Sequence, residues 1–314
     1  MGESMIPAAG QICELCCGAG GMAEGFSPFF DIVHAVDINP QVVQTYSANH
    51  QDTDVRQKDI RLLSGIRGDY DGITGVIGGP PCQGASIINT KRNEPDERNT
   101  LMGEYREEDP RNALMGEFMR LVTEIKPRFF VMENVPSVPK DRKESVIRTG
   151  KKAGYEISSV YLNAAEYGAA QTRKRWIVIG TQGKPWHLPI SRKAGTVREA
   201  FTGIKENWGV MQSRPDTLER LTHAIEGEWT GITGNFRSMI RLSWDRPAPA
   251  VVNPKKVYMV HPGENRNISL AEAASLQGFP AAYQWKGNES QIAQMIANAM
   301  PAQLAGAIAG SLVP

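Results

Sequence analysis

Apolar and polar positions alternate along the first half of the chain in short blocks that indicate strands and helices in turn. The apolar runs of strand length are QICELCC, DIVHAVDI, DGITGVIGG, RFFVMENV and RWIVIGT, at residues 11–17, 31–38, 71–79, 128–135 and 175–181. Between them, residues 40–49 are predicted to form a helix that begins at a proline, and residues 117–127 repeat apolar side chains with helical spacing until Pro127 stops them. Strands alternating with helices predict an α/β domain with a doubly wound, mostly parallel, Rossmann-like sheet.

The ends of these strands are where such a sheet binds ligands, and each carries polar or glycine residues. The first run leads into the glycine turn GAGG at residues 18–21, which allows close backbone approach by a nucleotide, a flavin or S-adenosylmethionine. The second run reaches Asp37, an acid placed to accept both hydroxyl groups of a ribose. Asp59 is placed to accept from an adenine amino group. Taken singly, Asp37 and Asp59 fit helix caps or surface acids equally well.

The next two strand ends carry a thiol and a carboxyl group. In GGPPCQGAS, residues 78–86, Cys82 follows two prolines that fix the backbone and is flanked by glycines that permit tight bends. Glu133 closes an apolar strand farther along the chain. A thiol and an acid at neighbouring strand ends describe a nucleophile and a proton donor. The plainer alternative for Cys82 is a small apolar side chain in a turn.

Three polar residues precede the last apolar run, in AAQTRKRWIVIG. Gln171, Arg173 and Arg175 share one face if the strand begins early, because side chains alternate along a strand. Two guanidinium groups directed at one pocket would lower the pKa of a thiol or bind phosphate. Without Cys82 and Glu133, a basic sheet edge would be the default interpretation.

Composition excludes several classes of protein. The 314 residues are 41% hydrophobic and 22% charged, as in ordinary globular proteins, and no apolar run approaches the ~20 residues of a membrane span. The four cysteines, Cys13, Cys16, Cys17 and Cys82, suit neither a disulfide framework nor a zinc site. We therefore expect a cytoplasmic protein with free thiols and no bound metal.

Basic charge and tryptophan are concentrated in one window. Residues 184–262 hold twelve Lys or Arg and seven Asp or Glu, a balance of +5, whereas the whole chain carries +1. Four of the six tryptophans lie in the same window. Such a segment suits contact with the phosphate backbone of a nucleic acid. An ordinary solvated face with buried tryptophans is the alternative.

Taken together and in order, these segments resemble the cytosine-5 DNA methyltransferase family. The similar stretches are the cofactor loop ELCCGAGG, the cysteine motif GGPPCQGAS, the run DPRNALMGEFMRLVTEIKPRFFVMENV, the arginine motif AAEYGAAQTRKRWIVIG, and the closing motifs LAEAASLQGFP and ANAMPAQLAGAIA. The resemblance covers roughly residues 12–180 and 241–310. The glycine loop alone is unspecific, whereas the ordered set of Cys82, Glu133 and 171–175 is specific.

The resemblance implies a covalent mechanism on a cytosine that is flipped out of its duplex. Cys82 would add to C6 of the base, so that C5 can take the methyl group of S-adenosylmethionine, leaving S-adenosyl-L-homocysteine. Glu133 would hold N3 and the exocyclic amine, and Arg175 the O2 side. Arg173 would support the same pocket and the thiolate.

The resemblance also implies two sets of binding residues. The cofactor-binding set is Leu15, Cys16, Gly18, Gly20, Gly21, Asp37, Ile38, Asp59, Ile60, Leu114, Asn298 and Met300. The substrate-binding set is Pro81, Gln83, Ser86, Arg111, Asn134 and Gln171. Three positions depart from the family pattern, which usually has Phe in place of Cys16 and of Ala85 and often Thr in place of Ala250.

The implied architecture is a class I methyltransferase domain formed by residues 1–183 and 263–314, with a smaller target-recognition domain inserted at residues 184–262. The implied partner is double-stranded DNA, bound by a monomer near the nucleoid, with no membrane contact. A cognate restriction endonuclease would act on the same sites without a stable complex.

Two alternatives remain open at this stage. One is a tRNA cytosine-5 methyltransferase, although that branch of the family carries a Cys-Phe-Thr signature in its recognition region and this chain has no cysteine after Cys82. The other is a catalytically silent DNA-binding member of the family.

Overall fold

The computed structural model describes residues 9–65, 68–81, 113–210, 219, 221–233, 238–254 and 259–313. Four of the predicted site residues, Cys82, Gln83, Ser86 and Arg111, lie outside these ranges. The other predicted site residues are all described.

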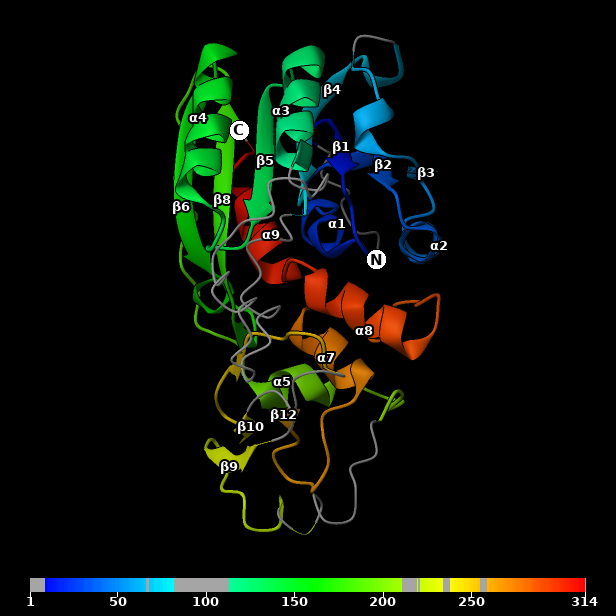
Figure 1. Ribbon diagram of the computed structural model, residues 1–314, viewed down its shortest axis with the longest axis vertical. Coiled ribbons are helices and arrows are strands. Elements are labelled where there is room, and N and C mark those ends of the chain that lie inside the picture. The colour runs from blue at the N-terminus through cyan, green and yellow to red at the C-terminus, as the bar shows by residue number, and fades with distance from the viewer. Residues whose placement is uncertain are drawn as a thin grey trace, which may run out of the picture.

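A seven-stranded sheet forms the centre of the molecule, in the order β3-β2-β1-β4-β5-β8-β6 (Figure 1). Its strands are β1 (Gln11–Leu15), β2 (Asp31–Asp37), β3 (Asp54–Gln57), β4 (Ile73–Gly78), β5 (Phe129–Asn134), β6 (Glu156–Asn163) and β8 (Lys174–Thr181). The pairs from β3 to β5 are parallel, and β8 runs antiparallel to both of its neighbours. The prediction of a doubly wound, mostly parallel sheet is confirmed.

Helices cover both faces of this sheet. The helices of the described residues are α1 (Gly21–Phe26), α2 (Pro40–Asn49), α3 (Leu114–Ile125), α4 (Lys140–Lys152), α5 (Val197–Thr202), α7 (Leu270–Leu276), α8 (Glu289–Asn298) and α9 (Ala302–Gly310). Helices α1, α2 and α9 pack on one face of the sheet and α3 and α4 on the other, whereas α5 and α7 lie below the sheet in Figure 1. Successive strand residues belong to opposite cores, as a pleated strand requires. Ile12 and Ile77 pack with α1 and α9, whereas Leu15 and Val76 pack with α3 and α4.

Local chemistry explains where the predicted helices begin and end. Helix α2 starts at Pro40 because the side chain of Asn39 caps it by accepting from the backbone N–H of Gln41. Helix α3 ends where Lys126 takes a left-handed conformation directly before Pro127. Both ends agree with the sequence prediction, and α3 begins at Leu114, three residues earlier than expected.

A second, smaller sheet lies below the first in Figure 1. It has the order β12-β10-β9, from β9 (Trp229–Thr233), β10 (Ser238–Arg241) and β12 (Met259–Val260). The short strand β11 (Ala248–Pro249) leaves this region and pairs with β7 (Gln171–Thr172), just before β8. This pairing brings the end of the window 184–262 against the arginine motif.

The chain then returns to its beginning. Helix α9 packs on α1 so closely that a Cβ at Gly25 would lie 2.4 Å from the backbone nitrogen of Gly306. A Cβ at Gly21 would likewise lie 2.5 Å from the carbonyl oxygen of Met300. Glycine is therefore required at both positions of α1. In the described part of the chain, no helix is both long and apolar enough to cross a membrane.

Candidate active site

One edge of the large sheet collects the ends of four neighbouring strands. Because β2, β1, β4 and β5 are parallel, their last residues meet at that edge. These residues are Leu15, Asp37, Gly78 and Asn134. The segments that follow them are the glycine loop, the turn into α2, the cysteine motif and the turn into α4. The topology thus brings together the motifs that the sequence spreads over 120 residues.

Glu133 and Arg175 form an ion pair at this edge. Antiparallel pairing places the end of β5 beside the start of β8, and Nε of Arg175 lies 2.5 Å from Oε1 of Glu133. Both side chains are only 11% exposed. A buried carboxylate needs such a partner, because a lone charge is costly in the interior. Nη1 of Arg175 donates to the carbonyl oxygen of Lys174 at 2.8 Å, so within the described residues the pair leaves the second carboxylate oxygen and Nη2 available for a bound group.

The start of the cysteine motif lies against this pair. A Cβ at Gly79 would be 3.0 Å from Oε2 of Glu133, so the absence of a side chain there lets the turn approach the carboxylate. The Asn134 side chain donates to the carbonyl oxygen of Pro80 at 2.8 Å and accepts from the N–H of Val135. Asn134 therefore fixes the turn that leads to Pro81 and Cys82.

Gln171 uses its whole side-chain amide to join separate segments. Its Nε2 donates to the carbonyl oxygen of Leu276 and to Oε1 of Gln277, at 2.7 and 2.8 Å. Its Oε1 accepts from the N–H of Val251 at 3.0 Å. The side chain is fully buried. This placement supports a positioning role for Gln171 and gives it no free polar atom for direct contact with substrate.

Arg173 makes a second set of buried links beside the first. Its two terminal nitrogens donate to the carbonyl oxygens of Val251 and Ala297. Burial, with the nearby charge of Arg175 adding to it, lowers the pKa of Arg173 well below its ordinary value. Among the described residues its Nε has no hydrogen-bond partner. Arg173 therefore holds two distant segments together and keeps one buried donor unused.

The glycine loop after β1 is tied to the end of β2 by Asp37. Oδ2 of Asp37 accepts from the N–H of Gly18 at 3.1 Å, and Oδ1 accepts from the N–H of Asn39 at 2.9 Å. Burial raises the pKa of the Asp37 carboxyl, and these backbone donors oppose the rise. Cys16 and Gly18 both take left-handed conformations, with φ of 53° and 54°. That conformation is unfavourable for a residue with a side chain, so Cys16 is held there by its surroundings.

The residues around this loop suit an adenosine group. A Cβ at Gly18 would meet no atom of the described residues within 4 Å, so with respect to them the backbone is open on that side. Ile38 is 61% exposed directly after Asp37, which offers an apolar surface beside a carboxylate. An apolar face for an aromatic ring and an acceptor for hydroxyl groups are what adenosine requires.

Asp59 has the capping role that the sequence left open. Its carboxylate accepts from the backbone N–H of Arg61 at 2.9 Å and starts the short 3₁₀ helix η1 (Ile60–Leu62). The Arg61 guanidinium also binds this carboxylate and lowers the pKa of Asp59. An adenine amino group would have to share these oxygens with Arg61.

The side chains of the remaining predicted cofactor-binding residues differ in how far they are exposed to solvent. Leu15 and Ile60 are buried in the core below the loop, so only their backbone can face a ligand. Leu114 begins α3 and is partly exposed. Met300 is buried and contacts Gly21 through its carbonyl oxygen, while the exposed Asn298 accepts from Gln294 at 2.7 Å. The segment after α8 therefore packs against the glycine loop through Met300, and the Asn298 side chain stays accessible.

Two residues that build this site are not among the site residues predicted from the sequence. Gln277 completes the buried amide contacts by donating to the carbonyl oxygen of Ile296 at 2.6 Å. Its signal in the sequence is a glutamine directly after the apolar run of α7, at a position that is fully buried. Gly79 is the second: the sequence predicts only that it permits a bend, and its closeness to Glu133 adds that a side chain there would crowd the carboxylate.

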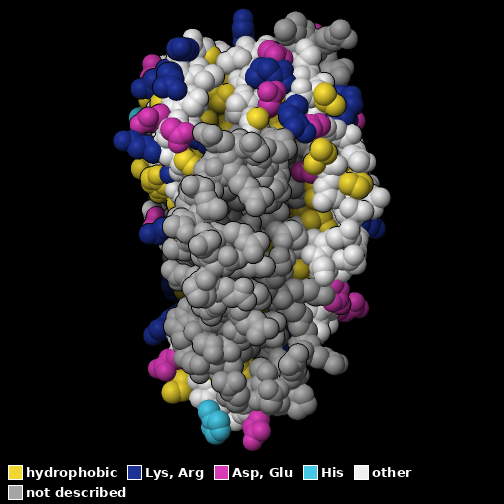
Figure 2. Space-filling model, viewed as in Figure 1, with side chains coloured by type: hydrophobic (Ala, Val, Ile, Leu, Met, Phe, Trp, Pro, Cys, Tyr) yellow, Lys and Arg dark blue, Asp and Glu magenta, His cyan; other side chains and the backbone are white. Residues whose placement is uncertain are grey.

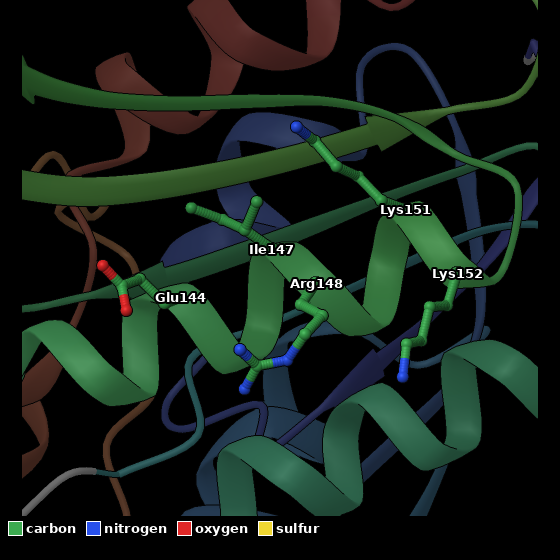
Figure 3. A pocket seen from close by; sticks show the side chains of 5 residues that line it. All are labelled: Glu144, Ile147, Arg148, Lys151 and Lys152. Carbon is green, nitrogen blue, oxygen red and sulfur yellow. The ribbon is translucent and has the colours of Figure 1, made fainter.

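A groove on α4 lies away from this chemistry (Figure 3). It is lined by Glu144, Ile147, Arg148, Lys151 and Lys152. Helix α4 ends with Lys151 and Lys152, just before β6 begins. The start of β6 lies beside the end of β8, because Glu156 pairs with Thr181, so this end of α4 is at the opposite end of the strands from the site. Figure 2 shows Lys and Arg interspersed with Asp and Glu on the upper part of that face. Within the described residues, no group of three or more His, Cys, Asp or Glu could hold a metal ion.

The fold and the family follow from comparison with known proteins. A candidate DNA modification methyltransferase encoded within an E. coli prophage superimposes with a TM-score of 0.78 at 24% identity, covering 96% of this chain and 98% of that one. The S. pombe Dnmt2 methyltransferase gives a TM-score of 0.70 at 17% identity, covering 97% and 98%. The fold is that of the class I methyltransferases.

The sequence comparisons identify the family. The model of the C-5 cytosine-specific DNA methylases matches residues 10–313. The type II methyltransferase M1.HphI of Haemophilus parahaemolyticus is 31% identical over 334 residues, covering 96% of this chain and 86% of the relative. M.FnuDI of Fusobacterium nucleatum is 28% identical over 338 residues, covering 95% and 93%. The chain belongs to the C-5 cytosine-specific DNA methylase family.

Proposed function

We propose that this chain transfers a methyl group from S-adenosylmethionine to C5 of a cytosine in duplex DNA, with Cys82 as the nucleophile. The single observation that carries the proposal is the buried pair of Glu133 and Arg175 directly beside the turn that leads to Cys82. The thiol of Cys82, the carboxyl group of Glu133 and the guanidinium of Arg175 would then surround the cytosine ring. A stacked base is out of reach of such a site, so the cytosine has to be flipped out.

Cys82 supplies the covalent step. Its thiolate adds to C6, the C5–C6 double bond opens, and C5 gains the electron density that it lacks in the aromatic ring. When bound, S-adenosylmethionine supplies an electrophilic methyl group. After C5 is methylated it loses its proton to solvent, and the electron pair of that C–H bond expels the Cys82 thiolate from C6. The free thiolate is restored, with no net oxidation or reduction.

Glu133 and Arg175 stabilise the ring during this addition. Density moves from C6 towards N3 and O2, so groups at those atoms bind the transition state better than the ground state. Glu133 would hold N3 and the exocyclic amine, and Arg175 the O2 side. Nε of Arg173 is a buried donor that the described residues leave without a hydrogen-bond partner. Arg173 and Gln171 would act mainly by holding this pocket together.

The cofactor would lie along the glycine loop. Asp37 would accept from the ribose hydroxyls and Ile38 would cover the adenine ring, because both are available at the end of β2. Gly18, Gly20 and Gly21 would border the methionine portion. Cys16 offers a thiol where the family usually has a phenyl ring, and we therefore place adenine stacking on Ile38 rather than on this residue.

DNA would be recognised by the inserted domain, which we assign to residues 184–262. Its +5 balance and its small sheet β12-β10-β9 suit a lobe that contacts phosphates and presents side chains to a groove. We expect a monomer in the cytoplasm near the nucleoid. A restriction endonuclease of the same specificity would share its DNA sites without binding it.

A methyl-transfer assay with labelled S-adenosylmethionine tests this proposal. Duplex DNA and tRNA are offered side by side, to the wild-type protein and to Cys82→Ala. The proposal expects label in DNA from the wild type alone, while both proteins bind the cofactor equally. Label in tRNA and none in DNA would favour the RNA-directed alternative. Absence of cofactor binding in calorimetry would favour the silent one.

A further inference from the structure

Tyr283 reaches the glycine loop from the far end of the sequence. It lies between α7 and α8, and its hydroxyl donates to the carbonyl oxygen of Ala19, 264 residues away. The side chain is 8% exposed. Its ring is packed between Phe279 and Trp285, with centroids 4.7 and 5.1 Å away. Packing of the ring against these two side chains therefore fixes the position of the hydroxyl.

The neighbours of this hydroxyl restrict the loop further. Nε2 of His50 lies 3.4 Å from the Tyr283 oxygen and 3.3 Å from Oε1 of Glu24 in α1. A Cβ at Gly20 would lie 2.6 Å from the Tyr283 oxygen and 2.8 Å from Nε2 of His50. Gly20 also has a φ of 86°, which a side chain disfavours. The loop backbone thus rests directly on the Tyr283 and His50 side chains.

Both ends of the peptide unit between Ala19 and Gly20 are held. Tyr283 binds its carbonyl oxygen, and the N–H of Gly20 donates to the carbonyl oxygen of Cys17 at 3.2 Å. A planar peptide fixed at both ends cannot rotate without breaking one of these bonds. The shape of the loop between Gly18 and Gly21 is therefore determined partly by a residue of the closing segment.

We propose that Tyr283 is a positioning residue for the cofactor loop. The inference rests on the proposed function, in which that loop binds S-adenosylmethionine. Tyr283 touches neither cofactor nor base; it acts by keeping the Ala19–Gly20 peptide in the orientation that the cofactor meets. Asp37 holds the same loop at Gly18, whereas Tyr283, which is not among the predicted site residues, holds it at Ala19.

The substitution Tyr283→Phe isolates the hydroxyl. The ring and its packing remain, but the Ala19 carbonyl loses its buried donor, and the loop gains freedom that binding must remove. We expect the Kd for S-adenosylmethionine to rise about fivefold to thirtyfold. The KM for the cofactor should rise equally, while kcat at saturating cofactor and the KM for DNA stay within about twofold.

Tyr155→Phe is the matched control. Tyr155 is also buried and its hydroxyl also donates to a backbone carbonyl, that of Pro127, at 2.8 Å. That bond lies before β5 and β6, at the sheet edge opposite the site. Both variants lose one buried hydrogen bond, so both should lower the melting temperature. Only Tyr283→Phe should weaken cofactor binding.

Calorimetry and initial rates on the full-length protein decide the matter. An unchanged Kd in Tyr283→Phe, or an equal rise in Tyr155→Phe, would overturn the inference while leaving the proposed function intact. A wild-type protein that binds no cofactor would instead refute the proposed function. If Tyr283→Phe does not fold, His50→Gln tests the same contact from its other side and should raise the KM for the cofactor alone. An unchanged KM in that variant overturns the inference as well.

Discussion

Nε of Arg175 lies 2.5 Å from Oε1 of Glu133, across the junction of β5 and β8. The two charges balance each other before any base arrives, so neither has to be buried alone. A flipped cytosine presents both donors and acceptors on its edge, and it can bind such a pair without adding net charge. The pairing of β5 with β8 therefore brings together the two charged groups that the proposed reaction uses.

Removing the charge of Glu133 tests its part in the reaction. Glu133→Gln keeps the shape but cannot act as an acid or base, so kcat should fall by about 10²- to 10⁴-fold. The Kd for S-adenosylmethionine should stay within about twofold, because the cofactor loop is not changed. Single-turnover methyl transfer and calorimetry give the two values. A variant with wild-type kcat would show that the carboxylate takes no part.

Arg173 should contribute mainly to stability and to the alignment of the pocket. Arg173→Gln removes the donors to Val251 and Ala297 and leaves two buried carbonyl oxygens without them. We expect the free energy of unfolding to fall by about 2–4 kcal/mol in urea titrations. Arg198→Gln is the control, since Arg198 pairs with Asp245 on the surface, and it should leave stability unchanged. Equal stability of the two variants would contradict the buried links.

Asp37 should determine cofactor affinity without affecting the covalent step. An asparagine has one acceptor oxygen in place of two, so Asp37→Asn loses either the bond from Gly18 or the one from Asn39, together with an acceptor for ribose. We expect the Kd for S-adenosylmethionine to rise at least about tenfold, as for loss of a charged hydrogen bond. Asp54→Asn, on the edge strand β3, is the control and should bind normally. Normal binding in both variants would place the ribose elsewhere.

Glu14 predicts a pH dependence of stability. It is buried in β1, accepts from the Tyr46 hydroxyl at 2.8 Å, and burial raises its pKa from 4.5 to about 8. Between these values the folded state holds a proton that the unfolded state releases, so the stability contributed by Glu14 is complete below about pH 4.5. That contribution is lost as the pH rises to about 8.

Glu14→Gln should remove this dependence. The glutamine oxygen still accepts from Tyr46 but carries no titrating proton. Unfolding in urea at pH 5.5 and pH 8.5 should therefore show the variant gaining stability relative to wild type at the higher pH, by a few kcal/mol at most. A difference between the proteins that does not change with pH would contradict the burial argument.

Much of the fold could be predicted from the sequence because central strands are buried on both faces and read as apolar runs. The two outer strands of the sheet and helix α4 could not be predicted in this way. Strand β6 has only Leu162 fully buried, β3 is four residues long, and α4 carries six Lys or Arg with only Val146 and Gly150 buried. Their polar sequences lack the periodic apolar pattern that marks a strand or helix.

In the site, too, some features could be predicted from the local sequence and others could not. Asp37 and Glu133 could be placed from sequence because each ends an apolar run, and the end of a strand is a local property. The partners of Arg173 could not, since Val251 and Ala297 lie 78 and 124 residues away and contribute only backbone oxygens. Side chains of these residues give no sign of the contact. The same holds for Tyr283 and Ala19.

The bond between Cys82 and cytosine C6 is the central claim, and a mechanism-based trap tests it most directly. A duplex that the protein methylates is prepared with 5-fluorocytosine at the target position. Fluorine cannot leave C5 as a proton does, so the thiol cannot be expelled after methyl transfer. We predict an adduct that survives denaturation, with the mass of protein, DNA and one methyl group, mapped to the peptide containing Cys82 and missing in Cys82→Ala. Turnover of the normal duplex with no trapped species, or an adduct on another cysteine, would contradict the account.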